Sequence, residues 1–156
     1  MIVRPHPQTV VSEKEILNPL KEKFSNLEWN FDNDNFEVLN RADLLITDFS
    51  GIIFDYALVF DKPLIYADTD FNTLPYDADW LDKEYWSLRV LPKLGYKLDE
   101  KSFADISSLI EKALHSSSLE KGREEIRSIC WKNQSNSTNA ISEYLIRKRE
   151  YLLKTK

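Results

Sequence analysis

Residues 42–68, ADLLITDFSGIIFDYALVFDKPLIYAD, contain the pattern from which we interpret the rest of the chain. The apolar run at 44–47 suits a short strand buried on both faces, and a second such run follows Pro63 at 64–67. Between them, apolar residues recur at spacings of three and four, which predicts a helix over 50–60. Strand, tight turn, helix and strand make a parallel β-α-β unit, for which we expect a right-handed crossover.

The polar turn between the first strand and the helix is a candidate anion site. Ser50 and Gly51 stand at a helix N-terminus, where free N–H groups and the helix dipole favour phosphate. Gly51 lets a ligand approach the backbone, the Ser50 hydroxyl can donate to a phosphate oxygen, and Asp48 precedes them. Asp55, one turn later, can accept from a ribose or polyol hydroxyl. Two simpler interpretations stay open: Ser50 only caps the helix, and Asp55 is a solvated carboxylate.

Composition limits the class of protein. A chain of 156 residues that is 42% hydrophobic and 30% charged suits one soluble globular domain with its own core. The net charge of -5 argues against non-specific nucleic-acid binding, so we expect no nucleic-acid partner. A single cysteine, Cys130, excludes an internal disulfide and a cysteine-built metal site, and we expect it to be a buried small residue in a reducing cytoplasm. No apolar run approaches the roughly 20 residues of a transmembrane helix.

The rest of the chain alternates between predicted strands and helices. Strands are expected at 2–4 and 27–31, and helices at 12–24, 35–41, 102–114, 119–131 and 138–153, whereas 69–98 stays unassigned. This alternation predicts a three-layer α/β/α Rossmann-like domain with a parallel sheet, and we treat residues 1–156 as one domain. Ligands of such sheets bind at the carboxyl ends of the strands. Because His6, Asp48 to Ser50 and Asp68 each follow a predicted strand, we expect three separated segments to meet in one cleft.

His6 is the best candidate for chemistry near the amino terminus. It lies between Pro5 and Pro7, which fix the backbone on both sides and remove competing amide donors. A pre-set imidazole suits a general base or a ligand for a phosphate group. The alternative is a histidine that is hydrogen-bonded in a rigid turn. Arg4, two residues earlier, could pair with phosphate or lie at the strand end without contacting a ligand.

Three motifs in this sequence resemble one known family. They are R-P-H-P at 4–7, N-R-A-D-L-L-I-T-D-F-S-G-I-I-F-D at 40–55 and K-P-L-I-Y at 62–66. Together they look like the C-terminal half of the CDP-glycerol glycerophosphotransferases, the teichoic-acid polymerases and primases of bacterial cell-wall synthesis. The resemblance is close over 1–68 and looser through the final helix. It implies a two-domain GT-B glycosyltransferase-like fold whose C-terminal half, the present chain, binds the nucleotide donor.

The resemblance also implies roles for individual residues. His6 matches the family's donor-side histidine, which contacts phosphate or assists transfer, and Ser50 matches the serine that begins the phosphate-facing helix. Asp55 matches the carboxylate one turn on, while Ser137 and Thr138 match a small polar helix start near the diphosphate. The implied reaction moves glycerol phosphate, or another polyol phosphate, from a CDP-activated donor to a hydroxyl of a lipid-linked acceptor. It requires no metal and no cofactor, because helix N-termini and histidine neutralise the diphosphate.

The chain enters a strand at Ile2 without a lead-in, so we expect it to be the back part of a longer enzyme. In the family an N-terminal domain holds the acceptor site and another essential histidine. The resemblance therefore implies that the 156-residue chain binds its donor without transferring, and that the last helix could pack on that other domain. The basic and apolar residues at 147–156 could instead contact an anionic membrane, which suits a cytoplasmic enzyme on the inner face of the plasma membrane. Alternatively, the basic residues only complement the helix dipole.

Other functions are compatible with the sequence. A Ser-Gly pair followed by a carboxylate also suits a UDP-sugar-dependent GT-B glycosyltransferase or epimerase domain, and the chain could be a non-catalytic nucleotide-binding module. A response-regulator-like domain fits less well, because the acidic pair and switch lysine that would accompany Asp48 are not evident. Gly51 stands where the family often has a second serine, and 85–89 matches its Tyr...Arg-Gly signature only loosely. The acceptor side and the donor's head group therefore stay open.

Overall fold

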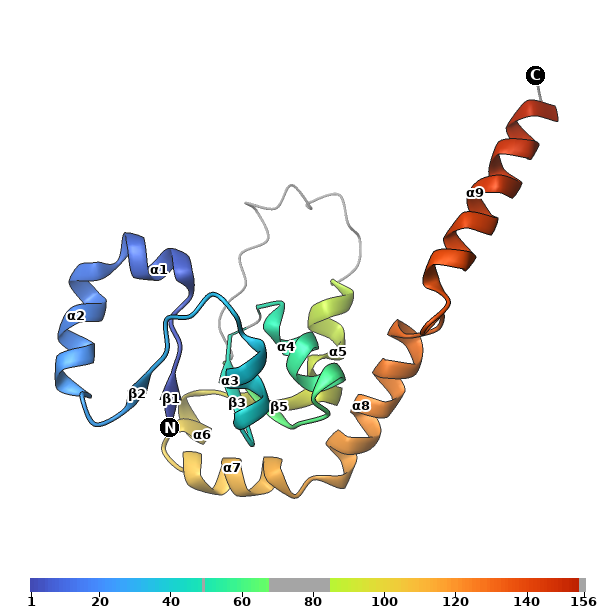
Figure 1. The fold of residues 1–156 in the computed structure, drawn as a ribbon. Coiled ribbons are helices and arrows are strands. Elements are labelled where there is room, and N and C mark those ends of the chain that lie inside the picture. Colours follow the sequence, from blue (N-terminus) through green and yellow to red (C-terminus); the bar gives the residue numbers. More distant parts are fainter. Residues whose placement is uncertain (49, 68–84, 155–156) are drawn as a thin grey trace. The chain divides into compact units, whose positions relative to one another are not determined.

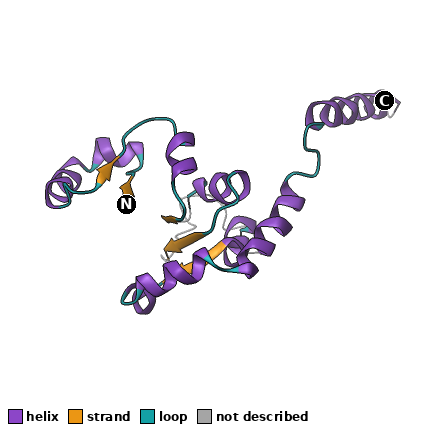
Figure 2. Cartoon of the chain, turned by 60° about the horizontal axis from the view of Figure 1, so that its bottom comes forward, coloured by secondary structure: helices purple, strands orange, loops and turns teal. Residues whose placement is uncertain are grey.

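The computed structural model describes residues 1–48, 50–67 and 85–154 (Figure 1). The chain forms two compact units, Met1–Ala42 and Asp43–Lys156. In each unit helices alternate with strands (Figure 2), and the strands of the described sheets pair in parallel. Because a parallel pair needs a crossover connection that usually contains a helix, this arrangement confirms the predicted α/β Rossmann-like class.

The first unit consists, in chain order, of β1 (Ile2–Val3), α1 (Pro7–Ser12), α2 (Lys14–Lys23), β2 (Glu28–Trp29) and α3 (Phe36–Arg41). β1 pairs with β2, so that Ile2 lies opposite Glu28. The prediction of one helix over 12–24 is wrong at its start. Ser12 is the last residue of α1, and a break at Glu13 separates that helix from α2.

The second unit consists, in chain order, of β3 (Leu45–Thr47), α4 (Ile52–Phe54), the π-helical turn η1 (Asp55–Val59), β4 (Leu64–Ala67), α5 (Trp86–Leu94), β5 (Gly95–Leu98), α6 (Glu100–Phe103), α7 (Ile106–Leu114), α8 (Ser117–Cys130) and α9 (Ser137–Lys154). β4 is the central strand of a parallel sheet in the order β3-β4-β5. Leu64 lies opposite Leu45 on one side and Gly95 on the other. The β-α-β unit is confirmed, with α4 and η1 as its helix. α5 and β5 fall in the stretch 69–98 that sequence reasoning left unassigned, of which 69–84 lies outside the described residues.

The core of the second unit forms on β4 and the helices around it. Leu64 and Ile65, which point to opposite faces of the strand, are fully buried, as are Tyr56 of η1 and Leu94 of α5. β3 differs, because Ile46 is 42% exposed. Burial on both faces is therefore right for β4 and wrong for β3, one of the two edge strands of the described sheet.

The packing of α8 depends on two adjacent residues of that helix, Gly122 and Arg123. Gly122 is buried against α5, and a Cβ atom there would lie 2.0 Å from the carbonyl oxygen of Lys93. The next residue, Arg123, has a side chain that is only 8% exposed and donates from Nε to Oδ1 of Asp61 over 2.9 Å. Nη2 of Arg127 lies 2.9 Å from the same oxygen. α8 is thus joined to the loop between η1 and β4 by one carboxylate and two guanidinium groups.

The electrostatics of this cluster keep Asp61 ionised. Burial by itself raises the pKa of the Asp61 carboxyl, but the hydrogen bonds from Arg123 and Arg127 together outweigh it and hold the pKa below its ordinary value. Asp61 also adopts a positive φ of 55°, a conformation that aspartate tolerates better than most residues. The two arginines therefore contact a loop whose backbone conformation is unusual.

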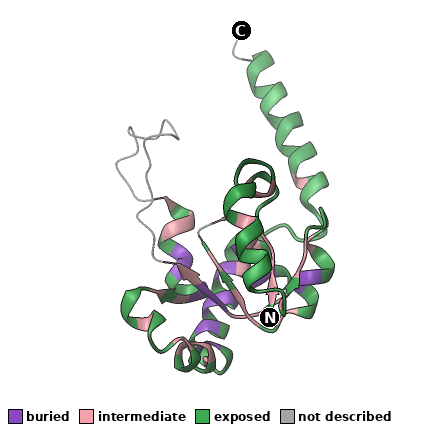
Figure 3. Cartoon of the chain, turned by 90° about the vertical axis from the view of Figure 1, so that its left-hand side faces the viewer, coloured by how far each residue is buried: buried purple, intermediate pink, exposed green. Residues whose placement is uncertain are grey.

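The C-terminal part of the second unit is largely exposed. Cys130, the last residue of α8, is exposed, which corrects the expectation that it is buried. α9 has no buried residue, and Figure 3 shows it in the exposed colour along most of its length. Within the described ranges, no helix has the length and apolarity needed to cross a membrane.

Candidate functional site

The turn between β3 and α4 is built by Asp48. Its Oδ1 accepts a hydrogen bond from the backbone N–H of Ser50 over 2.9 Å, which is the geometry by which aspartate forms a turn with its own chain. Asp48 is exposed, and the bond directs the chain from the strand into the helix. The predicted substrate-binding residue Asp48 therefore shapes the site through the backbone of Ser50.

Gly51 leaves open space in front of the helix start. Its φ of -59° and ψ of -20° are ordinary helical angles, so no backbone strain requires a glycine here. A Cβ atom built at Gly51 would meet nothing within 4 Å, and the residue is exposed. The first hydrogen bonds of the helix run from Ile53 N–H to the Ser50 carbonyl (3.2 Å) and from Phe54 N–H to the Gly51 carbonyl (3.1 Å). A ligand can reach this backbone from solvent.

The side chain of Ser50 does not cap the helix. Gly51 occupies the cap position, and no side chain makes a capping hydrogen bond there. Among the described residues, the Ser50 hydroxyl has no hydrogen-bond partner, whereas its backbone N–H and carbonyl are both used. Asp55 follows as the first residue of η1 and is exposed. Of the two simpler interpretations, the capping role of Ser50 is thus not observed.

His6 is held in one orientation by the first turn of α1. Pro7 is the first residue of that helix, and His6 occupies its cap position. Nδ1 of His6 accepts from the backbone N–H of Gln8 over 3.2 Å. An accepting Nδ1 assigns the proton of the neutral imidazole to Nε2, and the residue is exposed. The structure thus presents His6 to solvent as an Nε2–H donor.

Arg4 is engaged within its own unit. Its guanidinium donates to the side-chain oxygen of Asn30 and to the backbone carbonyl of Asp32. Asn30 in turn donates to the Asp32 carboxylate over 2.7 Å. Arg4 therefore braces the segment that follows β2, and a contact between Arg4 and phosphate stays a prediction.

Ser137 and Thr138 begin α9 and are exposed. The Ser137 hydroxyl donates to the carbonyl of Asn133 over 3.0 Å, one turn earlier. No contact within the described residues connects either side chain to Ser50, so their place near a diphosphate stays a prediction.

The structure groups the candidate residues by unit. Asp48, Ser50, Gly51 and Asp55 share one segment of the second unit, and His6 with Arg4 belongs to the first. Asp68, the third segment of the expected cleft, lies outside the described residues. The meeting of all three segments therefore stays a prediction. In the described part of the chain, no three His, Cys, Asp or Glu side chains gather in a way that could hold a metal ion.

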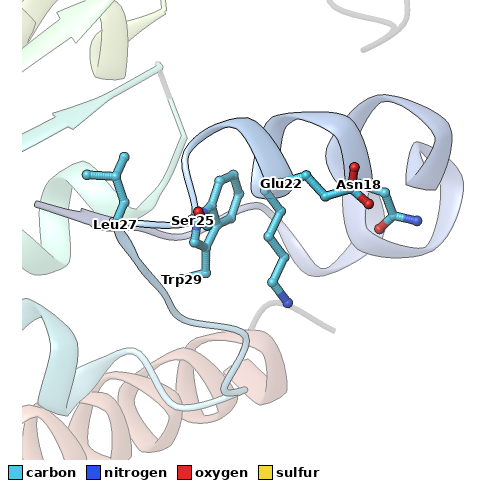
Figure 4. A pocket seen from close by; sticks show the side chains of 6 residues that line it. Asn18, Glu22, Ser25, Leu27 and Trp29 are labelled. Atoms are coloured by element: carbon cyan, nitrogen blue, oxygen red, sulfur yellow. The ribbon is translucent and has the colours of Figure 1, made fainter.

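A separate hollow of about 480 Å³ lies in the first unit, beside the end of α2 (Figure 4). It is lined by Asn18, Lys21, Glu22, Ser25, Leu27 and Trp29. None of the residues predicted from the sequence lines this hollow. The indole N–H of Trp29 donates to the carbonyl of Phe24 over 3.1 Å and so is already used within the unit.

Comparison with known families identifies the chain. The family model described as CDP-glycerol:poly(glycerophosphate) glycerophosphotransferase matches residues 1–80, just over half of the 156 residues. The chain therefore belongs to this family of glycerophosphotransferases. The matched range includes the R-P-H-P turn and the whole segment from β3 to β4. Curated proteins and solved structures give no match to the chain.

Proposed function

We propose that this chain binds the nucleotide donor of a glycerophosphotransferase reaction, and that the donor is CDP-glycerol or another CDP-activated polyol phosphate. The observation that supports the proposal is the open helix start at Ser50 and Gly51. It combines a hydroxyl that has no hydrogen-bond partner among the described residues with a backbone open at Gly51, and it lies inside the range that matches the family. The chain is then the donor-binding half of a GT-B-like transferase.

In this proposal the diphosphate lies over Ser50 and Gly51. The Ser50 hydroxyl donates to a phosphate oxygen, and the N–H groups at the helix start with the helix dipole supply further positive potential. Asp55 accepts a hydrogen bond from a hydroxyl of the ribose or of glycerol. Asp48 sets the turn, since one of its carboxylate oxygens is occupied by the Ser50 N–H.

The reaction itself is a substitution at phosphorus. An acceptor hydroxyl attacks the phosphorus bonded to glycerol and releases its proton to water, the bond from that phosphorus to the CMP oxygen breaks, and CMP leaves with the electron pair. Negative charge grows on the leaving phosphate, where positioned donors are most effective. His6 suits this role because its Nε2 bears the proton when Nδ1 accepts from Gln8. For the same reason His6 is not the base that removes the acceptor's proton.

The acceptor is proposed to be a lipid-linked polymer on the cytoplasmic side of a membrane, and α9 is proposed to contact that membrane. Five of the seven exposed apolar residues of α9 lie on one side at helical spacing, with Lys148 among them: Ile141, Tyr144, Leu145, Tyr151 and Leu152. Arg147 and Arg149 lie toward the two edges of that face, where a membrane-bound helix places its cations. Co-sedimentation with anionic vesicles at low salt, with and without residues 137–156, tests this. Equal binding of both forms, or none, contradicts it.

Isothermal titration calorimetry tests the donor. CDP-glycerol, CDP and UDP are titrated into the wild type, Ser50→Ala and His6→Ala, with His115→Ala as the control because His115 is exposed and has no proposed role. We expect tighter binding of CDP than of UDP. Loss of one hydrogen bond to a charged group should weaken CDP-glycerol about 10-fold in Ser50→Ala and His6→Ala and leave His115→Ala unchanged.

Each alternative function has its own result in this titration. Preference for UDP indicates the UDP-sugar-dependent domain. Equal binding of CDP and UDP removes the cytidine-specific part of the proposal. Binding of neither nucleotide contradicts donor binding by this chain. A separate assay for CMP release with a glycerophosphate acceptor measures transfer, for which we expect no turnover by the 156-residue chain alone.

A further inference from the structure

An aromatic pair flanks the proposed phosphate site. The rings of Phe54 and Trp86 stack with their centroids 5.7 Å apart and their planes 17° from parallel. Trp86 is 38% exposed, and Phe54 is half-buried. The indole therefore packs on Phe54 and still presents part of its surface to solvent.

Topology places this pair at the carboxyl edge of the second unit's sheet. β3 and β4 run parallel, so the chain leaves both strands at the same edge. α4 begins shortly after β3, and Trp86 is the first residue of α5, the next described helix after β4. The Phe54–Trp86 stack thus joins the beginnings of two helices at the edge where such sheets bind their ligands.

Helical spacing also relates Phe54 to the proposed donor site. Phe54 lies four residues after Ser50 and three after Gly51, and its N–H bonds to the Gly51 carbonyl over 3.1 Å. This hydrogen bond places Phe54 within one helical turn of the backbone at Gly51. The aromatic pair and the proposed phosphate-binding backbone are therefore close along the chain.

We infer that Trp86 provides the surface on which the cytosine ring of the donor stacks, while Phe54 supports the indole from behind. This inference rests on the proposed donor-binding function and assigns the subsite for the base. A flat aromatic surface that packs on Phe54, next to a phosphate site, suits a nucleoside diphosphate, whose base and phosphates need contacts of these two kinds. Stacking on an indole does not by itself select cytosine over uracil, so that selection requires other groups.

The test separates the base from the phosphates. Calorimetry measures the affinity of the wild type, Trp86→Leu and Trp86→Phe for CDP and for inorganic pyrophosphate, which has no base. Leucine keeps apolar packing against Phe54 but has no flat ring, and phenylalanine keeps one. Phe103→Ala is the control, because Phe103 is a 65% exposed aromatic residue of the same unit. Circular dichroism confirms that each variant is folded.

We expect Trp86→Leu to weaken CDP binding about 5- to 100-fold, the range for loss of one base–aromatic stack. Pyrophosphate affinity should be unchanged, Trp86→Phe should recover most of the CDP affinity, and Phe103→Ala should match the wild type. If Trp86→Leu binds CDP as the wild type does, or loses CDP and pyrophosphate equally, the inference is wrong while donor binding stands. If the wild type binds neither ligand, both the inference and the proposed function fail.

Discussion

Replacement of Gly122 by alanine should force α8 away from α5. The new Cβ atom would lie 2.0 Å from the Lys93 carbonyl oxygen, against an ordinary contact of about 3.4 Å or more, and a backbone carbonyl cannot rotate away as a side chain can. The helices must therefore separate by about 1.4 Å, the difference between these two distances, around the buried side chains of Leu94 and Ile126. Overpacking against backbone costs about 3 kcal/mol, while alanine regains about 1 kcal/mol of helix propensity. The net expected loss is about 2 kcal/mol in the free energy of unfolding.

Urea unfolding followed by circular dichroism measures this loss. Gly51→Ala is the matched control, because a Cβ atom there would meet nothing within 4 Å and the backbone is helical. It should change the free energy of unfolding by less than about 1 kcal/mol. If Gly122→Ala is as stable as the wild type, or is stabilised by its helix propensity, the close packing of α5 and α8 is refuted.

Further tests follow from other contacts. Asp61→Asn should lower the free energy of unfolding by about 1–3 kcal/mol, because Arg123 is buried, and a double-mutant cycle with Arg123→Met should show coupling. The folded-state pKa of Asp61 is lowered, so its contribution is complete above the unfolded pKa of about 4 and is lost as the pH falls through the folded value. Urea titrations should therefore show that the free energy of unfolding falls more between about pH 6 and about pH 3 in the wild type than in Asp61→Asn. Equal decreases contradict this. Asp99→Ala should lower the midpoint of a thermal melt, because Asp99 accepts from Ser102 N–H over 2.8 Å at the start of α6, and an unchanged midpoint contradicts the cap. Deletion of 137–156 should leave the urea midpoint unchanged, because α9 has no buried residue, and a lower midpoint contradicts this.

The sequence predicts the elements that depend on neighbouring residues better than the features that depend on residues far apart in the chain. β4 is predicted with its observed bounds, because a central strand is apolar at every position and Pro63 marks its start. β3 has the same apolar character, but it lies at an edge of the described sheet, where one residue of the strand is exposed. A short apolar run does not reveal the order of the strands, so its sequence could not distinguish an edge strand from a central one. The sequence did not predict α5 and β5, because Pro92 lies inside α5 and a proline usually indicates that a helix has ended.

The same distinction applies to the candidate site. A helix start at Ser50 and Gly51 follows from spacing alone, whereas the proton position on His6 depends on its bond to Gln8 and requires coordinates. Arg123 resembles an ordinary surface charge of a helix, because its partner Asp61 is 62 residues away. A glycine inside a helical pattern, Gly122, is the one local signal that could have indicated close packing at α8.

The central claim, that the donor diphosphate lies at the start of α4, can be tested by nuclear magnetic resonance with ¹⁵N-glycine labelling. The chain contains three glycines, Gly51, Gly95 and Gly122, so the spectrum contains three backbone signals that can be assigned by single substitutions. Addition of CDP-glycerol should shift the Gly51 signal in a saturable way and leave the signal of Gly122, buried where α8 packs on α5, in place. A Gly51 signal that does not move at saturating CDP-glycerol, or a shift confined to Gly122, would contradict the account.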